Sequence, residues 1–119
     1  MENTHYSTKG VHIVADLWEC DAQALNNEAY LKTLLHESAR AANMHVVGET
    51  SHTFTPQGVT SILLLEESHI SIHTYPEVHY AAVDIYTCGT DSQPQKALDM
   101  IVKSLHTQKA NTKIINRGE

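Results

Sequence analysis

Alternation of hydrophobic and polar residues predicts several β-strands. Residues 10–18, GVHIVADLW, alternate and are rich in β-branched side chains, as is typical of a half-buried strand. The same criteria predict strand structure at 44–56, 59–77, 80–89 and, as a short final strand, 112–117. The segment 59–77 holds one long strand or two consecutive ones, and Pro76 should end it because proline lacks a backbone N–H.

Two segments have the three- and four-residue spacing of an amphipathic helix. Between Asn27 and Asn43 one face carries Leu31, Leu34, Leu35, Ser38, Ala41 and Ala42. Residues 92–108 repeat this pattern, with Pro94 in the first turn. The order β–α–β–β–β–β–α–β and its tight turns predict an α+β fold, a two-layer sandwich in which both helices pack on one face of a mainly antiparallel sheet.

Length and charge narrow the choice of function. The 119 residues fit a single domain, 1–119, without an internal linker. With a net charge of −6 and only 8 Lys and Arg residues, the chain is not expected to bind nucleic acid. No signal-peptide pattern and no membrane-length apolar run occur, so we expect a cytoplasmic protein with no membrane partner, in which Cys20 and Cys88 are free thiols.

The most reactive side chains lie in the most apolar segment, LLLEESHISIHTYPE (63–77). Ser68 lacks the flanking glycines of the hydrolase motif G-x-S-x-G, so it is either a structural strand serine or has another chemical role. In a regular strand Ser68 and His73 face opposite sides. Either the backbone is irregular at 67–69 or these two residues have different roles.

The nine histidines raise the question of a metal site. His69 and His73 would lie about 13 Å apart along a strand, too far to share one ion. The chain has no paired cysteine motif and no H-E-x-x-H, and we predict no metal site. A zinc site here would need a further ligand from another strand, namely His12, His52 or His79.

Three other residues have two interpretations each. Cys88 is either a small buried hydrophobe or a proton donor, since thiol pKa values respond strongly to their surroundings. Phe54 and Tyr75 belong to the core, or they line a pocket in which they stack on a flat ring or face a cation.

LEESHISIHTYPE followed by YAAVDIYTCG closely resembles the prokaryotic S-adenosylmethionine decarboxylase proenzymes. GVHIVADLWECD and HTFTPQGVTS support the resemblance, which runs in order from about Gly10 to Asp91. It implies that the chain cleaves itself between Glu67 and Ser68. The products would be a β chain, 1–67, and an α chain, 68–119, whose first residue is a pyruvoyl group derived from Ser68.

The resemblance also implies roles for individual residues. The pyruvoyl ketone would form a Schiff base with the substrate amine and draw electrons from the breaking carbon–carboxylate bond. The residues that match the family are His73 as the processing acid/base, Thr60 as processing support, Cys88 as the proton donor, Phe54 and Tyr75 beside the adenine, and Glu77 on the ribose.

The function expected from the resemblance is decarboxylation of S-adenosylmethionine, which supplies the aminopropyl donor for spermidine synthesis. The expected assembly is a homodimer of αβ units with active sites at the interface. One alternative is the same pyruvoyl chemistry on arginine or ornithine. An alternative of another class is a non-catalytic, His-rich metal-binding domain.

Overall fold

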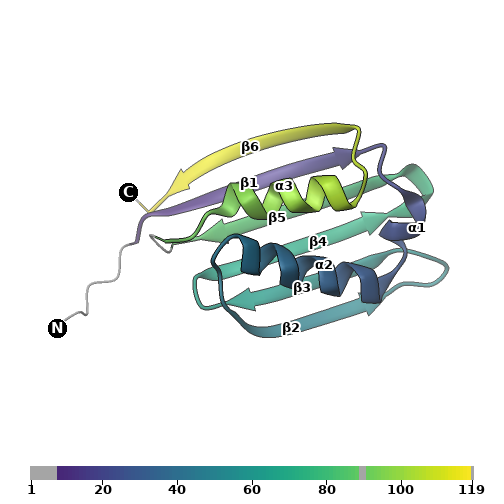
Figure 1. Cartoon of the computed structure of the whole chain (residues 1–119). Coiled ribbons are helices and arrows are strands. Elements are labelled where there is room, and N and C mark those ends of the chain that lie inside the picture. The colour runs from purple at the N-terminus through teal and green to yellow at the C-terminus, as the bar shows by residue number, and fades with distance from the viewer. Residues whose placement is uncertain (1–7, 89–90, 119) are drawn as a thin grey trace.

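Six antiparallel strands form one sheet in the order β2-β3-β4-β5-β1-β6 (Figure 1). The computed structural model describes residues 8–88 and 91–118. The strands are β1 (Gly10–Trp18), β2 (Val46–Thr53), β3 (Val59–Leu65), β4 (Ser68–Tyr75), β5 (Tyr80–Thr87) and β6 (Lys109–Arg117). The predicted strand 80–89 is therefore confirmed as far as Thr87, while Gly89 lies outside the described residues.

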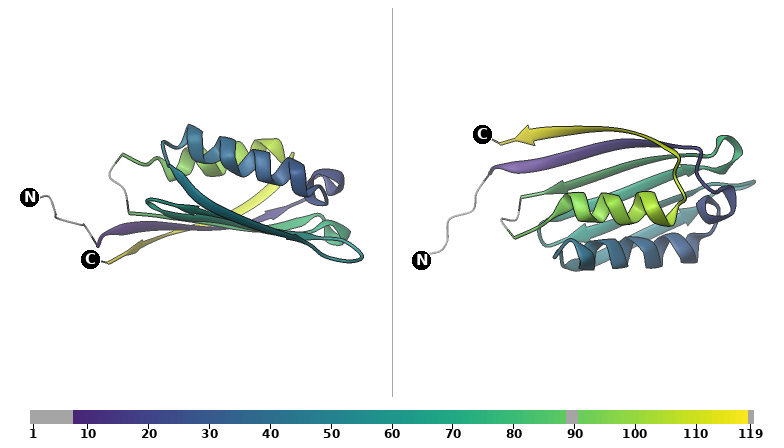
Figure 2. Two further views of the ribbon diagram at one scale, coloured as in Figure 1. Left: turned by 90° about the horizontal axis from the view of Figure 1, so that it is seen from below. Right: turned by 45° about the horizontal axis from the view of Figure 1, so that its top comes forward.

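Both predicted helices, α2 (Glu28–Ala41) and α3 (Pro94–Ser104), cover the same face of the sheet and pack against each other (Figure 2). Asn27 caps α2, because its side chain accepts a hydrogen bond from the Tyr30 N–H. Two shorter elements, α1 (Ala22–Leu25) and the 3-10 turn η1 (Pro76–Val78), were not predicted. The predicted α+β sandwich is confirmed, and none of the described helices is long and apolar enough to span a membrane.

The core lies between the sheet and the two helices. Alternate strand residues such as Ile13, Leu63 and Ile72 face the helices and are almost fully buried. They pack against the apolar stripes of α2 and α3, where Leu31 and Ile101 are fully buried. Burying a side chain of this size contributes roughly 1.5–3 kcal/mol, so the core fixes which face of each strand points inward.

The predicted segment 59–77 consists of two strands, β3 and β4, joined by a tight turn. Leu63 pairs with Ile70 and Leu64 with His69, so only Glu66 and Glu67 remain between the strands. The two acids therefore form a hairpin turn, where their carboxylates reach solvent or partners at the edge of the core. From Ser68 onward β4 is regularly paired with β3 and β5.

Candidate active site

The peptide bond between Glu67 and Ser68 lies directly after the β3–β4 turn. Ser68 pairs with Thr87 across β4 and β5, so the next residue, Cys88, lies opposite Glu67. The Cys88 backbone N–H donates to the Glu67 carbonyl oxygen at 3.2 Å, and the Cys88 thiol donates to the same oxygen at 3.3 Å. Two donors on one carbonyl oxygen are suited to stabilise negative charge that develops there during attack on the carbonyl carbon.

The Glu67 side chain is held from the other side by His45, the residue before β2. The His45 backbone N–H donates to Glu67 Oε1 at 3.0 Å, and His45 Nδ1 lies 2.8 Å from Oε2. Burial raises the pKa of Glu67, but the hydrogen bonds from His45 outweigh burial and lower it below its usual value. The same hydrogen bond raises the pKa of His45, so the pair favours carboxylate and imidazolium.

Ser68 and His73 are not brought together within one chain. Ser68 shares the helix-facing side of β4 with Ile70, whereas His73 lies on the open side, where Thr60 Oγ1 is 3.2 Å from its Nδ1. Five residues of strand separate Ser68 from His73 by about 16 Å. The irregular backbone lies before Ser68, at Glu66 and Glu67, and does not change which face either side chain occupies.

A second group of predicted residues meets at the opposite end of the sheet. A cleft of about 340 Å³ lies beside the end of β4, and its lining includes five predicted site residues, namely Phe54, Thr60, His73, Tyr75 and Glu77. The interpretation of Phe54 and Tyr75 as core residues is wrong, because their side chains are 48% and 45% exposed. Glu67, Ser68 and Cys88 do not line this cleft. Figure 1 shows the two ends, with the β3–β4 turn at the left and the β2–β3 loop at the right.

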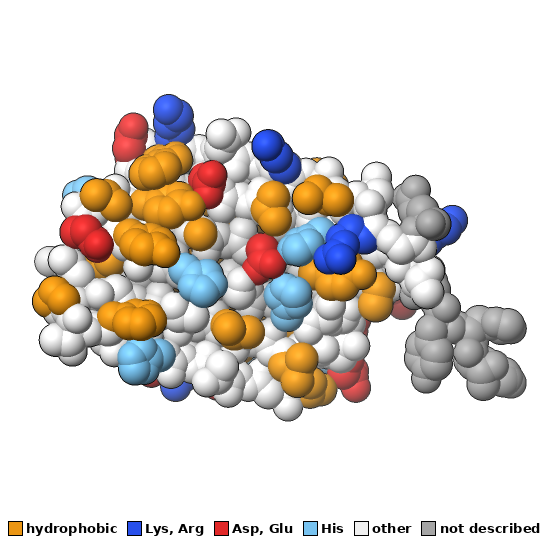
Figure 3. All heavy atoms as spheres, turned by 180° about the vertical axis from the view of Figure 1, so that it is seen from behind, with side chains coloured by type: hydrophobic (Ala, Val, Ile, Leu, Met, Phe, Trp, Pro, Cys, Tyr) orange, Lys and Arg blue, Asp and Glu red, His pale blue; other side chains and the backbone are white. Residues whose placement is uncertain are grey.

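The side of the sheet away from the helices carries exposed hydrophobic side chains and histidines together (Figure 3). Trp18 stacks on Tyr80 with ring centroids 4.2 Å apart, and Tyr80 stacks on Tyr75 at 5.5 Å. Burial and the Asp16 carboxylate raise the pKa of Tyr80 to about 12, so its hydroxyl stays protonated. We call this side the open face; its exposed large hydrophobic residues include Trp18, Leu64, Tyr75 and Ile115.

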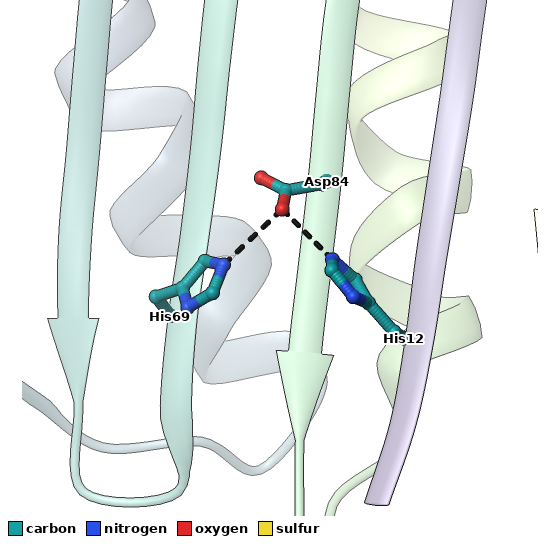
Figure 4. A group of neighbouring side chains, drawn as sticks. All are labelled: His12, His69 and Asp84. Atoms are coloured by element: carbon teal, nitrogen blue, oxygen red, sulfur yellow. Dashed lines mark hydrogen bonds and ion pairs between the residues drawn. The ribbon is translucent and has the colours of Figure 1, made fainter. Parts of the chain in front are cut away.

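A cluster of polar side chains lies on the open face between the two ends (Figure 4). His12 Nε2 is 2.8 Å and His69 Nε2 is 3.2 Å from Asp84 Oδ2, and Ser71 donates to Oδ1. Burial raises the pKa of Asp84, but hydrogen bonds from these three partners outweigh it and lower the pKa below its usual value. The strand order β4-β5-β1 therefore brings His12 close to His69, which is one of the pairings that a zinc site would need. Asp84 on β5 lies between the two histidines, and sequence reasoning had not included it.

The ligand atoms of His12, His69 and Asp84 lie within 4.8 Å of one another, close enough for the group to hold a metal ion. Arg117 Nη1, however, lies 3.4 Å from His12 Nδ1. A guanidinium can only donate, so Nδ1 accepts, and Nε2 carries the proton that His12 donates to Asp84. The arrangement is therefore that of a hydrogen-bonded cluster that keeps Asp84 ionised.

The two cysteines differ in burial, and Cys88 is not the small buried hydrophobe that one of its two interpretations predicted. Cys88 is exposed, so that interpretation is wrong, while Cys20 is buried and burial raises its pKa. Both are free thiols, as predicted. Sequence reasoning missed His45, because only the pairing of Val46 with Leu65 reveals that it adjoins Glu67.

Comparison with known proteins gives a consistent result. The profile of the family described as S-adenosylmethionine decarboxylase matches residues 11–118. The chain is 45% identical over 113 residues to S-adenosylmethionine decarboxylase proenzyme 2 of Bacillus cereus, covering 95% of this chain and 92% of that protein. It is 42% identical over 109 residues to the S-adenosylmethionine decarboxylase proenzyme of Methanococcus aeolicus, covering 92% and 93%.

A solved structure shares the fold as well. The crystal structure of the adenosylmethionine decarboxylase from Aquifex aeolicus superposes with a TM-score of 0.87 at 37% sequence identity, covering 92% of this chain and 91% of that one.

Proposed function

The chain belongs to the S-adenosylmethionine decarboxylase family, and we propose that it is a self-processing, pyruvoyl-dependent decarboxylase of S-adenosylmethionine. The observation that carries the proposal is the pair of Cys88 donors on the carbonyl oxygen of the Glu67–Ser68 peptide. Neither an arginine or ornithine substrate nor a non-catalytic metal-binding domain is supported by the relatives, which are named as S-adenosylmethionine decarboxylase proenzymes.

In the proposed self-cleavage, the Ser68 hydroxyl reacts with the carbonyl group of the residue that precedes it, Glu67. Oγ attacks the Glu67 carbonyl carbon and the C–N bond breaks, while the hydroxyl proton is passed to the leaving nitrogen. An ester to Ser68 Oγ and a free Ser68 amine thus replace the amide. The Cys88 donors stabilise the oxygen on which charge develops, which offsets part of the lost amide resonance. Removal of the Ser68 α-proton then expels Glu67 as a carboxylate, and hydrolysis of the remaining enamine consumes one water and releases one ammonia. The α chain 68–119 is left with a pyruvoyl group at its start, and the β chain is 1–67.

The pyruvoyl group supplies the electron sink for loss of CO₂. Cys88 fits the role of proton donor, because its exposed thiol lies 3.3 Å from the Glu67 carbonyl oxygen, next to the residue that becomes the pyruvoyl group. A proton held there can be delivered to the substrate carbon after CO₂ leaves. The product would be the aminopropyl donor for spermidine biosynthesis.

The cleft at the opposite end suits the nucleoside part of the substrate. Phe54 and Tyr75 offer two exposed aromatic rings for the adenine, and Glu77 offers a carboxylate that can accept hydrogen bonds from the ribose hydroxyls. The Thr60–His73 pair in the same cleft is the proposed processing pair, with His73 as acid/base and Thr60 in support.

A dimer of αβ units reconciles these roles with the distance between them. One chain carries the scissile bond at one end of the sheet and His73 with the cleft at the other. Two copies related by a two-fold axis and stacked through their open faces would place the scissile bond of each over the cleft of its partner. The exposed apolar side chains of the open face would be buried in such a dimer. Both thiols are free, which fits the reducing cytoplasm as the location.

Two measurements on purified protein test the proposed function. Intact-mass analysis should find two chains divided at Glu67–Ser68, whose masses sum to the precursor plus one water minus one ammonia. An assay of CO₂ release should find turnover of S-adenosylmethionine, with arginine and ornithine as matched controls. An uncut chain, or a cut chain that releases CO₂ from neither S-adenosylmethionine nor its close analogues, would overturn the proposal.

A further inference from the structure

Three hydrogen bonds join His45 to the two residues of the β3–β4 turn. The His45 N–H and Nδ1 each contact a different oxygen of the Glu67 carboxylate, at 3.0 and 2.8 Å. The Glu66 N–H in turn donates to the His45 carbonyl oxygen at 2.9 Å. This cross-strand contact exists because Val46, the first residue of β2, pairs with Leu65, the last residue of β3. Glu67 is thus bound at its side chain by His45 and at its carbonyl oxygen by Cys88.

We propose that His45 is a positioning residue for self-cleavage, which holds Glu67 so that its carbonyl oxygen stays on the Cys88 donors. The proposal rests on the self-processing function proposed above. With both its side chain and its carbonyl fixed, Glu67 presents one face of its carbonyl carbon to the Ser68 hydroxyl. Displacement of a reacting atom by about 1 Å can slow a reaction by as much as 100-fold, so a contact at this residue affects the rate without touching the reacting atoms.

The charges around His45 set the pH range in which this contact is strongest. Glu66 Oε1 lies 3.9 Å from His45 Nδ1, and the cleft beside the ring is also lined by His36 and Arg40. Within this group the Glu67 hydrogen bond is the main cause that raises the pKa of His45. The protonated ring makes a charge-assisted hydrogen bond, which is stronger than the bond from a neutral ring.

The chain offers a matched control in a second histidine–glutamate pair. His36 Nε2 lies 2.9 Å from Glu49 Oε1, and this pair joins α2 to β2 without bonding to Glu66 or Glu67. Substitution of His36 removes a similar exposed contact with the same chemistry. A general effect on folding would appear in both variants, whereas a positioning effect would appear only at His45.

The test follows cleavage of the full chain made by cell-free translation and quenched at intervals. His45→Ala should slow cleavage about tenfold, whereas His36→Ala should match the wild type. His45→Asn should restore most of the rate, because its amide nitrogen lies about where Nδ1 does. The ratio of wild-type to His45→Asn rates should fall as pH rises through the pKa of His45, since only the histidine loses a charge. Once cut, His45→Ala should have the wild-type kcat per pyruvoyl group.

Any of the following outcomes would overturn the proposal that His45 is a positioning residue. Wild-type cleavage by His45→Ala, equal slowing in His36→Ala, or no rescue by His45→Asn would show that the ring contact does not position the bond. A pH-independent rate ratio would show that the ring charge has no part in it. A wild-type chain that never cleaves would instead overturn the proposed function itself, which keeps the two failures distinct.

Discussion

The two ends of the sheet differ in what their residues can do. At the cleavage end a tight turn presents the Glu67–Ser68 bond, whose carbonyl oxygen is bound by the Cys88 N–H and thiol. At the binding end, exposed Phe54 and Tyr75 frame a cleft of about 340 Å³. In the proposed function, one end activates a peptide bond and the other accepts a flat ring. On that proposal the chain carries two half-sites, separated by the length of β4.

The separation has a physical cause in the regularity of β4. Ser68 begins the strand and Tyr75 ends it, with unbroken pairing to β5 in between. A strand of this kind cannot fold back on itself, so no local movement joins its ends. We infer that completion of each site needs a second copy.

Loss of the nucleophile should have the largest effect and should be confined to the cleavage end. Ser68→Ala removes the hydroxyl proposed to attack the Glu67 carbonyl, so we expect an uncut chain and a loss of decarboxylation of at least about 1,000-fold. Intact-mass analysis and CO₂ release measure the two effects. The cleft at the other end is untouched, so the variant should still bind S-adenosylmethionine in calorimetry; lost binding would mean that the two ends are not independent.

Mixing two variants tests whether the ends cooperate across a dimer. His73→Ala alone should cleave about 100-fold more slowly, the loss typical of a missing acid/base group. Co-expressed with Ser68→Ala under a different tag, the His73→Ala chain should be cleaved, because its partner supplies His73. The double variant Ser68→Ala/His73→Ala is the control and should not rescue. Rescue in neither mixture, or normal cleavage by His73→Ala alone, would contradict the shared site.

Much of this arrangement could be predicted from the sequence. Period-two alternation and helical spacing indicated the strands, the helices and most of the face that each buries, because burial of Leu and Ile side chains decides these features. Ala41, predicted on the buried face of α2, is exposed, and Ala39 is buried instead. The opposite facing of Ser68 and His73 followed from the same alternation. Its consequence, two half-sites in one chain, depends on the regularity of β4, which the pattern left open.

Contacts across strands could not be predicted, because they depend on register and strand order. Nothing in the sequence places Cys88 beside the Glu67 carbonyl, or His45 beside the Glu67 carboxylate. The sequence left open whether a turn divides 59–77, because three leucines before Glu66 and β-branched residues after Ser68 are equally typical of one long strand and of two. The contacts of Asp84 with His12 and His69 were not predicted for the same reason, because the sequence does not reveal the strand order.

Cys88 should separate the two reactions that occur at the cleavage end. Cys88→Ala keeps the backbone N–H donor but loses the thiol, so we expect cleavage to continue severalfold more slowly while turnover falls about 100-fold. Cys88→Ser keeps a side-chain donor and should cleave nearly as fast as the wild type, yet decarboxylate slowly. Cleavage time courses and CO₂ release per pyruvoyl group measure these rates. Equal loss of both reactions in Cys88→Ala would contradict this division.

At the binding end, removal of one aromatic ring should weaken substrate binding without affecting cleavage. Tyr75→Ala removes a ring that is 45% exposed beside the cleft, and we expect KM for S-adenosylmethionine to rise about tenfold through lost stacking. Tyr30→Ala removes a ring of similar exposure, 40%, on α2 and should leave KM unchanged. Steady-state kinetics on fully cut protein measure the change. Slower cleavage in Tyr75→Ala would mean that this ring also supports the processing role of His73, which lines the same cleft.

The smallest effect is expected midway between the ends, at Asp84. Its carboxylate accepts hydrogen bonds from His12, His69 and Ser71, and Asp84→Asn should lower the free energy of unfolding by about 1–2 kcal/mol at neutral pH. The folded-state pKa lies below the usual 3.8, so the stabilisation is complete above that value and is lost as pH falls through the folded pKa. Urea unfolding at fixed protein concentration should therefore show the free energies of unfolding of the variant and the wild type converging in acid.

Asp99→Asn, on the exposed side of α3, is the control, and its free energy of unfolding should stay within about 0.5 kcal/mol of the wild-type value. A difference at Asp84 that stayed constant with pH would mean that the cluster stabilises the open face by packing alone and not by holding an ionised carboxylate.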